Sequence, residues 1–234
     1  MSKKKRSPRR PLSRGLEILY EDRDLLVVNK PAGLLTVKTM TEKTRTVHHI
    51  LTDYVRKGNP KSRNRIFTVH RLDQWTSGVL IFAKSETVKD CLQARWKETK
   101  KTYVAVVHGQ LKAKEGVITS YLAENTRHVV YSTPDAAKGK LARTAYKVLK
   151  EKGQFSLLEI NLLTGRKNQI RVHLADQGHP IVGDRKYGDN KDGFSRLALH
   201  SKSICFPHPT RDELMTMETK VPGCLRKIVG IVST

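Results

Sequence analysis

The sequence predicts one α+β domain, with a large mixed, mostly antiparallel β-sheet flanked by helices and loops. Two observations support this fold class. Short apolar segments with the alternation typical of strands recur from residue 16 onward, whereas only a few segments show helical spacing. The 234 residues, 38% of them hydrophobic, are enough to bury one sizeable core. No internal repeat or second linker divides the chain.

The first part of the chain is expected to form strands and two helices. The strands are predicted at residues 16–20, 25–29, 66–70 and 78–83. The first helix covers residues 47–55 and ends at Gly58-Asn59-Pro60. The second begins after Ser85, whose side chain suits an N-cap, and extends to about residue 98.

The second part is expected to consist mainly of strands. They are predicted at residues 103–107, 117–121, 129–132, 144–149, 155–162, 196–200 and 214–219. Lys152-Gly153 is the expected turn of a hairpin. A third helix is predicted over residues 168–177, with Gly178 at its C-terminal end.

The first residues are set apart by their charge. Residues 1–14 contain seven basic residues and no acidic one, and they show no apolar periodicity. This composition is typical of a flexible segment. We therefore expect a flexible basic arm over residues 1–15, followed by the folded domain over residues 16–234.

The whole chain is strongly basic, with 45 Lys and Arg residues against 22 Asp and Glu and a formal net charge of +23. The arm holds only seven of these cations, so the folded part is basic as well. Such an excess is usually tolerated because a polyanion binds, which makes nucleic acid the expected partner. A membrane is not favoured, since no terminal segment forms a basic amphipathic helix and no apolar run could span a bilayer.

The cysteines and histidines indicate no disulfide framework and no metal site. Cys91, Cys205 and Cys224 are odd in number and far apart, which fits a reducing compartment. The nine histidines lack the spacing of a zinc site. Because the N-terminus lacks the apolar stretch of a signal peptide, we expect a cytoplasmic protein, monomeric by default.

The segment from His70 to Gly78 reads HRLDQWTSG and is the most informative in the chain. It places a carboxylate, Asp73, in a polar loop between two strands, and such loops are favourable places for catalytic groups. Arg71 lies two residues away and would share its face in an extended chain. Taken alone, an aspartate in a polar loop more often caps a turn than it takes part in catalysis.

A second segment, residues 163–174, reads LTGRKNQIRVHL and continues as ADQGHPIVGD, followed by Tyr187-Gly188. Its cations Arg166, Lys167 and Arg171 surround a helix start, where anions are favoured by side chains and free backbone N–H groups. A solvated helix end is an adequate explanation for Lys167. It is a poorer one for Arg171, because an arginine between apolar residues usually needs a carboxylate partner.

Both segments resemble the RluA-type family of RNA pseudouridine synthases. The family signature H-R-L-D-x-x-T-S-G matches the first, and G-R-x-x-Q-I-R-x-H-L followed by G-H-P-I-x-G-D and Y-G matches the second. Three more stretches match family elements in the expected order, so the resemblance covers about residues 16–210. These stretches are DLLVVNKPAG at 24–33, KTYVAVVHG at 101–109, and Leu199-His200 with FPHP at 206–209.

The chain departs from the family pattern at two points. Asn168 stands where the family often has histidine, and asparagine cannot transfer protons. The small S4 RNA-binding module found ahead of many relatives is expected to be absent. We therefore expect the catalytic domain and the arm to recognise the RNA.

The resemblance implies isomerisation of uridine to pseudouridine in RNA, with Asp73 as the essential carboxylate. The reaction breaks the N1–C1′ bond and rejoins the base through C5, so no atom or electron is exchanged and no cofactor is implied. Asp73 could attack C1′ or C6, or take the C2′ proton, and all three routes stay open. The family pattern gives Arg171 as the ion-pair partner of Asp73, Tyr103 as the residue against the target base, and Arg71 as the residue that fills the space of the flipped base.

The RNA partner is expected to be large-subunit ribosomal RNA, transfer RNA or both. Further cations are predicted to bind it, namely Arg166, Lys167, Lys84 and Lys101. A non-catalytic RNA-binding or ribosome-assembly protein is the alternative that composition alone would favour. A synthase of the small-subunit type, which usually reads G-R-L-D with T-x-G-L-L, fits less well because this chain has His70 and Thr76-Ser77-Gly78-Val79.

Overall fold

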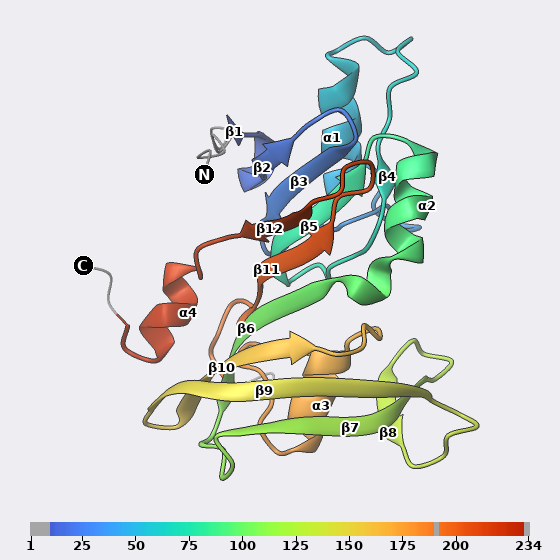
Figure 1. The fold of residues 1–234 in the computed structure, drawn as a ribbon. Helices are drawn as coiled ribbons and strands as arrows, with labels where there is room; N and C mark the ends of the chain where they lie inside the picture. The colour runs from blue at the N-terminus through green and yellow to red at the C-terminus, as the bar shows by residue number, and fades with distance from the viewer. Residues whose placement is uncertain (1–9, 190–191, 232–234) are drawn as a thin grey trace. The chain divides into compact units, whose positions relative to one another are not determined.

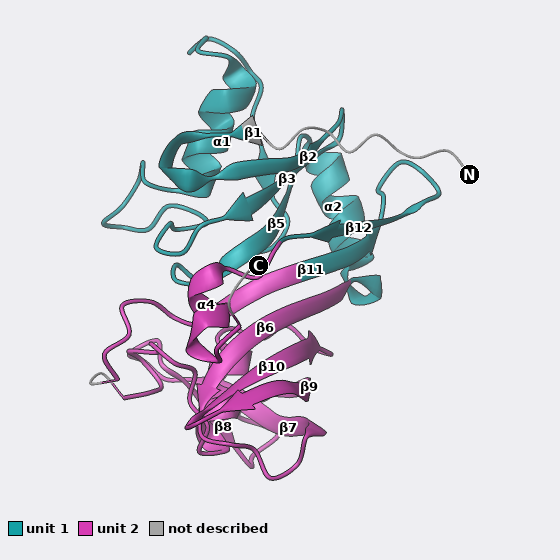
Figure 2. Ribbon diagram, turned by 90° about the vertical axis from the view of Figure 1, so that its left-hand side faces the viewer, with its two compact units in different colours: residues 1–99, 203–219 teal, residues 100–202, 220–234 magenta. Residues whose placement is uncertain are grey.

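Strands dominate the chain in the computed structural model, which describes residues 10–189 and 192–231. Contacts divide the chain into two units (Figure 2). Unit 1 consists of residues 1–99 and 203–219, and unit 2 of residues 100–202 and 220–234. Among the described residues, no helix combines the length and hydrophobicity that a membrane span needs.

In unit 1 the strands pair in the order β1-β2-β3-β5, with β4 also on β5 and β12 on β11, and these pairs are antiparallel. Two helices accompany them, α1 (Val47–Arg56) and α2 (Glu86–Ala94). The Thr46 side chain caps the first turn of α1, and the Ser85 side chain caps that of α2. The strands are β1 (Arg10–Pro11), β2 (Glu17–Glu21), β3 (Leu25–Lys30), β4 (Phe67–Thr68), β5 (Ser77–Ala83), β12 (Leu214–Glu218) and, from residue 203 onward, β11 (Leu199–Pro207).

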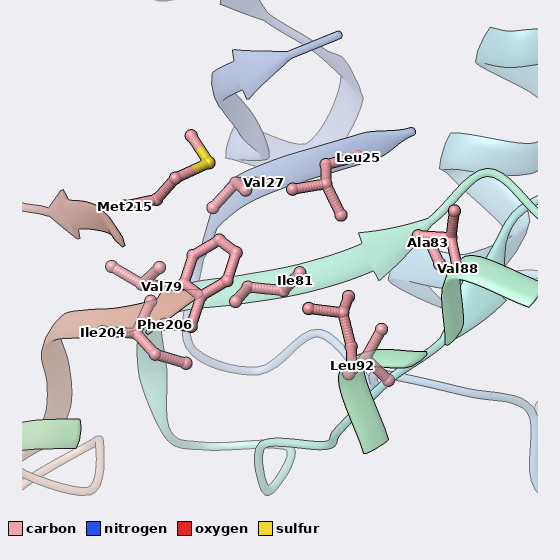
Figure 3. Packing of buried hydrophobic residues seen from close by; sticks show 11 residues of the cluster. Leu25, Val27, Val79, Ile81, Ala83, Val88, Leu92, Ile204, Phe206 and Met215 are labelled. Atoms are coloured by element: carbon pink, nitrogen blue, oxygen red, sulfur yellow. The ribbon is translucent and has the colours of Figure 1, made fainter. Parts of the chain in front are cut away.

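The core of unit 1 forms where alternate residues of neighbouring strands point to one side (Figure 3). Leu25 and Val27 of β3 meet the alternate residues of β5, and α2 adds its apolar face. Phe206 of β11 is fully buried among them. The other members are Val69, Val79, Ile81, Ala83, Val88, Leu92, Ile204 and Met215.

In unit 2 the strands pair antiparallel in the order β6-β10-β9-β7-β8. Helix α3 (Gln169–Asp176) packs against β7, β8 and β9, behind them in the view of Figure 1. A short helix, α4 (Gly223–Ile228), contacts β6. The strands are β6 (Lys100–His108), β7 (Glu115–Glu124), β8 (Val130–Thr133), β9 (Lys140–Lys152) and β10 (Phe155–Leu162).

A buried histidine fixes which face of the unit 2 sheet carries α3. His173 of α3 has its Nδ1 2.9 Å from Thr144 Oγ1 and its Nε2 3.0 Å from Ser120 Oγ. Burial lowers the pKa of His173, which favours the neutral ring in this network. The side chains that share a face with Thr144 therefore lie beneath the helix.

Most of the predicted elements are confirmed, and the exceptions have local physical causes. The strand predicted at 66–70 is only Phe67–Thr68, because the His70 side chain accepts a hydrogen bond from the Ile81 N–H at 3.1 Å. The second helix ends at Ala94, and a 3-10 turn follows at Trp96–Glu98. The strand placed near 196–200 is β11 and runs on to Pro207, since β12 pairs with its second half.

Two elements were not predicted. Helix α4 has a single buried apolar residue, Leu225, and so shows no helical periodicity in the sequence. The segment Arg10–Pro11 pairs with β2, and a 3-10 turn follows at Ser13–Gly15, so regular structure begins before residue 16. The rest of the expected basic arm, residues 1–9, lies outside the described residues. A single folded domain over residues 16–234 stays a prediction.

The buried His200 gives a test of the fold. Burial, helped by the charge of Arg196 and opposed by a backbone hydrogen bond with Lys220, lowers the pKa of His200 from 6.5 to about 4. Unfolding restores the ordinary pKa, so this contribution to stability is complete above pH 6.5 and is lost as the pH falls toward 4. At pH 5 we expect it to lower the free energy of unfolding by about 2 kcal/mol relative to pH 7.

Urea unfolding of the wild type and of His200→Gln at the two pH values measures this contribution. The variant should lose less stability between pH 7 and pH 5 than the wild type does. His49→Gln is the matched control, since the His49 side chain is 45% exposed. Equal pH dependence in all three proteins would show that His200 is not a buried neutral group.

Candidate active site

Asp73 lies in unit 1, in the loop that joins β4 to β5, and its neighbours in sequence are held on both sides. Thr36 Oγ1 donates to the Leu72 carbonyl at 2.8 Å and accepts from the Leu72 N–H at 3.3 Å. The Gln74 carbonyl accepts the Gly33 N–H at 2.9 Å. The Asp73 backbone is therefore fixed from either side, while its side chain stays partly exposed.

A fully buried lysine, Lys30, supplies the strongest part of this support. Its Nζ donates to the carbonyls of Leu34 at 2.7 Å, Gln74 at 2.8 Å and Pro31 at 3.0 Å. Three N–H donors meet three acceptors, which offsets the cost of burying the ammonium. In the sequence Lys30 lies within the segment DLLVVNKPAG with no assigned role, and its only signal is a lysine two residues after the apolar run Leu25–Val28.

The glycine of the same segment is required by the geometry of the loop. Gly33 has φ = +89°, a conformation that residues with a side chain rarely adopt. A Cβ atom there would stand 3.4 Å from the indole ring of Trp75. Because the Gly33 N–H binds the Gln74 carbonyl, this glycine lets the two loops approach closely.

Of the other residues in the HRLD motif, His70 has a structural role and Arg71 is exposed to solvent. The His70 ring accepts the Ile81 N–H and lies 4.8 Å from the ring of Trp96, so it fixes the start of the loop. The Arg71 side chain is exposed, and it has no acidic partner among the residues that the structure describes. Arg71 is thus available to a ligand, whereas His70 is not.

Arg171 lies in unit 2 on α3 and forms a bidentate ion pair with Asp184. Its Nε donates to Oδ2 at 2.8 Å and its Nη2 donates to Oδ1 at 2.7 Å. Asp184 is fully buried and Arg171 is 14% exposed. The expectation that Arg171 needs a carboxylate is confirmed with Asp184, and its pairing with Asp73 stays a prediction.

The segment that follows Asp184 completes the surroundings of the guanidinium. The carboxylate also accepts the N–H groups of Lys186 and Tyr187 at 3.0 and 3.1 Å. The guanidinium of Arg171 lies over the Tyr187 ring, 5.1 Å from its centre. Asn168 donates to the Tyr187 hydroxyl at 3.0 Å, so this amide serves as a hydrogen-bonding group.

Tyr103 lies on the same face of the unit 2 sheet as α3. The strand register places Tyr103 opposite Ile160, and Ile160 opposite Tyr146, which is two residues from Thr144 beneath α3. Lys101 precedes Tyr103 by two residues and shares this face. Burial lowers the pKa of Lys101. The strands and helix of unit 2 therefore bring Tyr103, Lys101 and α3 to one side.

The remaining predicted RNA-binding cations are partly engaged within the protein. Lys167 forms an ion pair with Glu124, and Arg166 donates from Nε to the Leu141 carbonyl at 3.0 Å. Lys84 donates to the Glu21 carboxylate at 2.7 Å and to the Asp22 carbonyl at 2.6 Å. Lys84 thus ties β5 to the β2–β3 turn, which gives it a structural role that the sequence did not indicate.

Within the part of the chain that the structure describes, no group of His, Cys, Asp and Glu side chains is arranged to hold a metal ion. Among the predicted site residues, unit 1 contains Asp73, whose backbone is fixed, and the exposed Arg71. Unit 2 supplies a tyrosine and a second, carboxylate-bound guanidinium.

Comparisons with known proteins identify the fold. Residues 24–176 match the RNA pseudouridylate synthase family. The chain belongs to this family. The ribosomal large subunit pseudouridine synthase C of Vibrio parahaemolyticus is 35% identical over 91% of this chain and 68% of its own length. The tRNA pseudouridine synthase C of Haemophilus influenzae is 34% identical over 86% of this chain and 91% of its own.

A solved structure gives the same result. The human RNA pseudouridylate synthase domain containing 1 is 27% identical, covers 89% of this chain and 84% of its own, and superimposes with a TM-score of 0.71. The α+β fold predicted from the sequence is confirmed, and so is the RluA-type resemblance. The protein is an RNA pseudouridine synthase, an isomerase.

The Arg171–Asp184 pair yields a prediction. Removing one partner of a buried ion pair leaves an uncompensated charge, so Asp184→Leu should lower the free energy of unfolding by about 3 kcal/mol or more. Removing both, in Arg171→Met with Asp184→Leu, should destabilise less than the sum of the single changes. Urea unfolding of the four proteins measures the coupling, and additive effects would contradict a direct interaction.

Proposed function

We propose that this synthase isomerises uridines in structured ribosomal or transfer RNA with Asp73 as its essential carboxylate. The observation that carries the proposal is the fixed backbone at Asp73, whose neighbours Leu72 and Gln74 are bound by Thr36 and Lys30. A catalytic group must be held in one position to act efficiently, and the surrounding hydrogen bonds do this. A turn-capping aspartate would have no need of a buried lysine nearby.

Asp73 acts on the ribose or on the base. A carboxylate can attack C1′ or C6, or accept the C2′ proton, and each route leads to cleavage of the N1–C1′ bond and reattachment through C5. No electron or external atom enters the reaction. Arg171 contributes a guanidinium that orients the Asp73 carboxylate, while Asp184 holds Arg171 in place.

Arg71 and Tyr103 act on the RNA itself. A uridine must leave the base stack before its glycosidic bond can be reached, and the exposed Arg71 fills the space that it vacates. Tyr103 packs against the flipped base, and its hydroxyl takes part in removal of the C5 proton. Arg166, Lys167, Lys84 and Lys101 add positive charge for the phosphates, although Lys167 and Lys84 share theirs with carboxylates.

The substrate proposal rests on two kinds of support. One relative is named for the ribosomal large subunit and another for transfer RNA. The net charge of +23 fits a large polyanion. Both RNA types are present in the cytoplasm, where three free cysteines are also expected. We therefore place the enzyme there, acting as a monomer without metal or cofactor.

The first test measures release of tritium from C5 of uridine. Total RNA from cells that lack the gene, labelled with tritium at C5, is incubated with the wild type and with Asp73→Asn. We expect release by the wild type and a rate at least about a thousandfold lower for the variant. Asp90→Asn, which neutralises an exposed carboxylate on α2, is the matched control and should keep the wild-type rate.

Wild-type protein that binds RNA without releasing tritium would contradict the proposal and favour a non-catalytic RNA-binding role. Full activity of a folded Asp73→Asn protein would show that another group does the chemistry. Mapping of the modified nucleotide would then distinguish ribosomal from transfer RNA.

A second test separates the two functions of Tyr103. Tyr103→Phe keeps the ring and removes the hydroxyl, whereas Tyr103→Leu removes both. If the hydroxyl takes part in loss of the C5 proton, Tyr103→Phe should bind RNA normally and release tritium about a hundredfold more slowly. Comparable rates for wild type and Tyr103→Phe, with loss only in Tyr103→Leu, would restrict Tyr103 to packing.

A further inference from the structure

The segment between α1 and β4 carries an unusual concentration of charge. No acidic residue occurs between Asp53 and Asp73. We call residues 57–65 the basic loop; it projects beyond the strands of unit 1 in both ribbon views (Figures 1 and 2). Its cations are exposed, namely Lys57, Lys61, Arg63 and Arg65.

The basic loop is folded, and its own polar groups hold its shape. The Asn59 side chain accepts the Lys61 N–H at 3.0 Å, and the Asn59 carbonyl accepts the Ser62 N–H at 3.0 Å. Asn64 donates from its side chain to the Val55 carbonyl at 3.3 Å, which ties the far end of the loop back to α1. The cations are therefore presented from a preformed backbone, which lowers the entropic cost of binding a ligand.

The four cations of the basic loop have no counter-charge in the described part of the chain, as is also true of the exposed Arg71, whereas several other cations of unit 1 do have one. Lys89, Arg95 and Arg211 each lie within 3.2 Å of a carboxylate oxygen on a neighbouring residue or strand. Across the described ranges, none of the four basic-loop cations has such a partner. The C-terminal end of α1 favours Lys57 through the helix dipole, but this effect ends within the last turn and does not reach the other three.

The composition of the basic loop indicates which part of a polyanion it fits. Its exposed side chains include no aromatic residue on which a base could stack, and the small ring of Pro60 is the only apolar side chain that it could offer to a membrane. Arg65 lies over the Phe67 ring at 5.7 Å, but that ring is half-buried. Point charges on a preformed backbone suit the phosphates of a duplex, which are read by shape.

We propose that the basic loop is a second RNA-binding site, which binds the phosphodiester backbone of a stem in the substrate RNA. The proposal rests on the proposed function insofar as it takes the ligand to be the substrate. In this proposal, residues outside the segments that match the family signature contribute to the affinity for RNA and to the position in which the RNA is bound.

The test compares two charge-matched variants, both in the Asp73→Asn background so that catalysis does not enter. One has Gln at Lys57, Lys61, Arg63 and Arg65. The other has Gln at four exposed lysines of unit 2, namely Lys112, Lys140, Lys147 and Lys150. Binding of a fluorescein-labelled RNA hairpin is measured over a salt series, and the thermal midpoint of each variant confirms folding.

Loss of the basic-loop cations should weaken binding at least about tenfold at ~0.1 M salt. The slope of log Kobs against log salt should become shallower by about 3, since each phosphate contact contributes ~0.7 to 0.9. The unit 2 variant should change both quantities much less. Equal losses in the two variants would show that only diffuse charge matters and would overturn the proposal.

Three further measurements test where the contact lies and which ligand makes it. Bound hairpin should protect Lys57 and Lys61 from acylation, read by mass spectrometry, and should leave Lys89 reactive. Lack of protection would overturn the proposal. So would an equal loss of affinity for single-stranded oligouridine, or tighter loop-dependent binding to phosphatidylserine vesicles than to RNA.

The outcome is independent of the tritium assay. A basic-loop effect on binding together with an inactive wild type would refute the proposed function and retain this site. An active wild type without a basic-loop effect would do the reverse.

Discussion

The burial of the Lys30 ammonium is the constraint on which the candidate site depends. An ion with no exposed surface is tolerated only where its hydrogen bonds are complete, and here the acceptors are carbonyls from two separate loops. One of these carbonyls belongs to Gln74, next to Asp73. The requirement to satisfy a buried charge therefore becomes a requirement on the position of the candidate carboxylate. Solvent could not impose such a position on a surface loop.

Unit 2 also contains a buried charged group whose hydrogen bonds must be satisfied, but its charge is negative. The fully buried group there is the Asp184 carboxylate, which needs donors, and it receives them from the Arg171 guanidinium and two backbone N–H groups. The Arg171 guanidinium therefore lies on α3, the helix that packs on the face of the sheet that carries Tyr103. In each unit a buried ion at a loop fixes a residue that the family pattern identifies as functional.

Sequence alone predicted most of the helices and strands along the chain and named candidate site residues, but it did not show which residues support that candidate site. Alternation and capping residues determine β3, β5 and α2 locally, so they could be read directly. The roles of Lys30 and Asp184 depend on partners 44 and 13 residues away. Such pairings are properties of the tertiary fold, and a resemblance names these residues without explaining what they hold.

The sequence also could not show which cations are available to bind RNA. Lys84 and Lys167 looked like ligands for phosphate because lysine is basic, yet each faces a carboxylate of its own unit. The charge available to RNA is that which no internal acid neutralises, and a sequence does not show which cations those are. The sequence indicates such cations best along residues 54–72, because no acidic residue occurs there and local partners are therefore few. A long run without acids is thus better evidence for a phosphate-binding surface than the net charge of the chain.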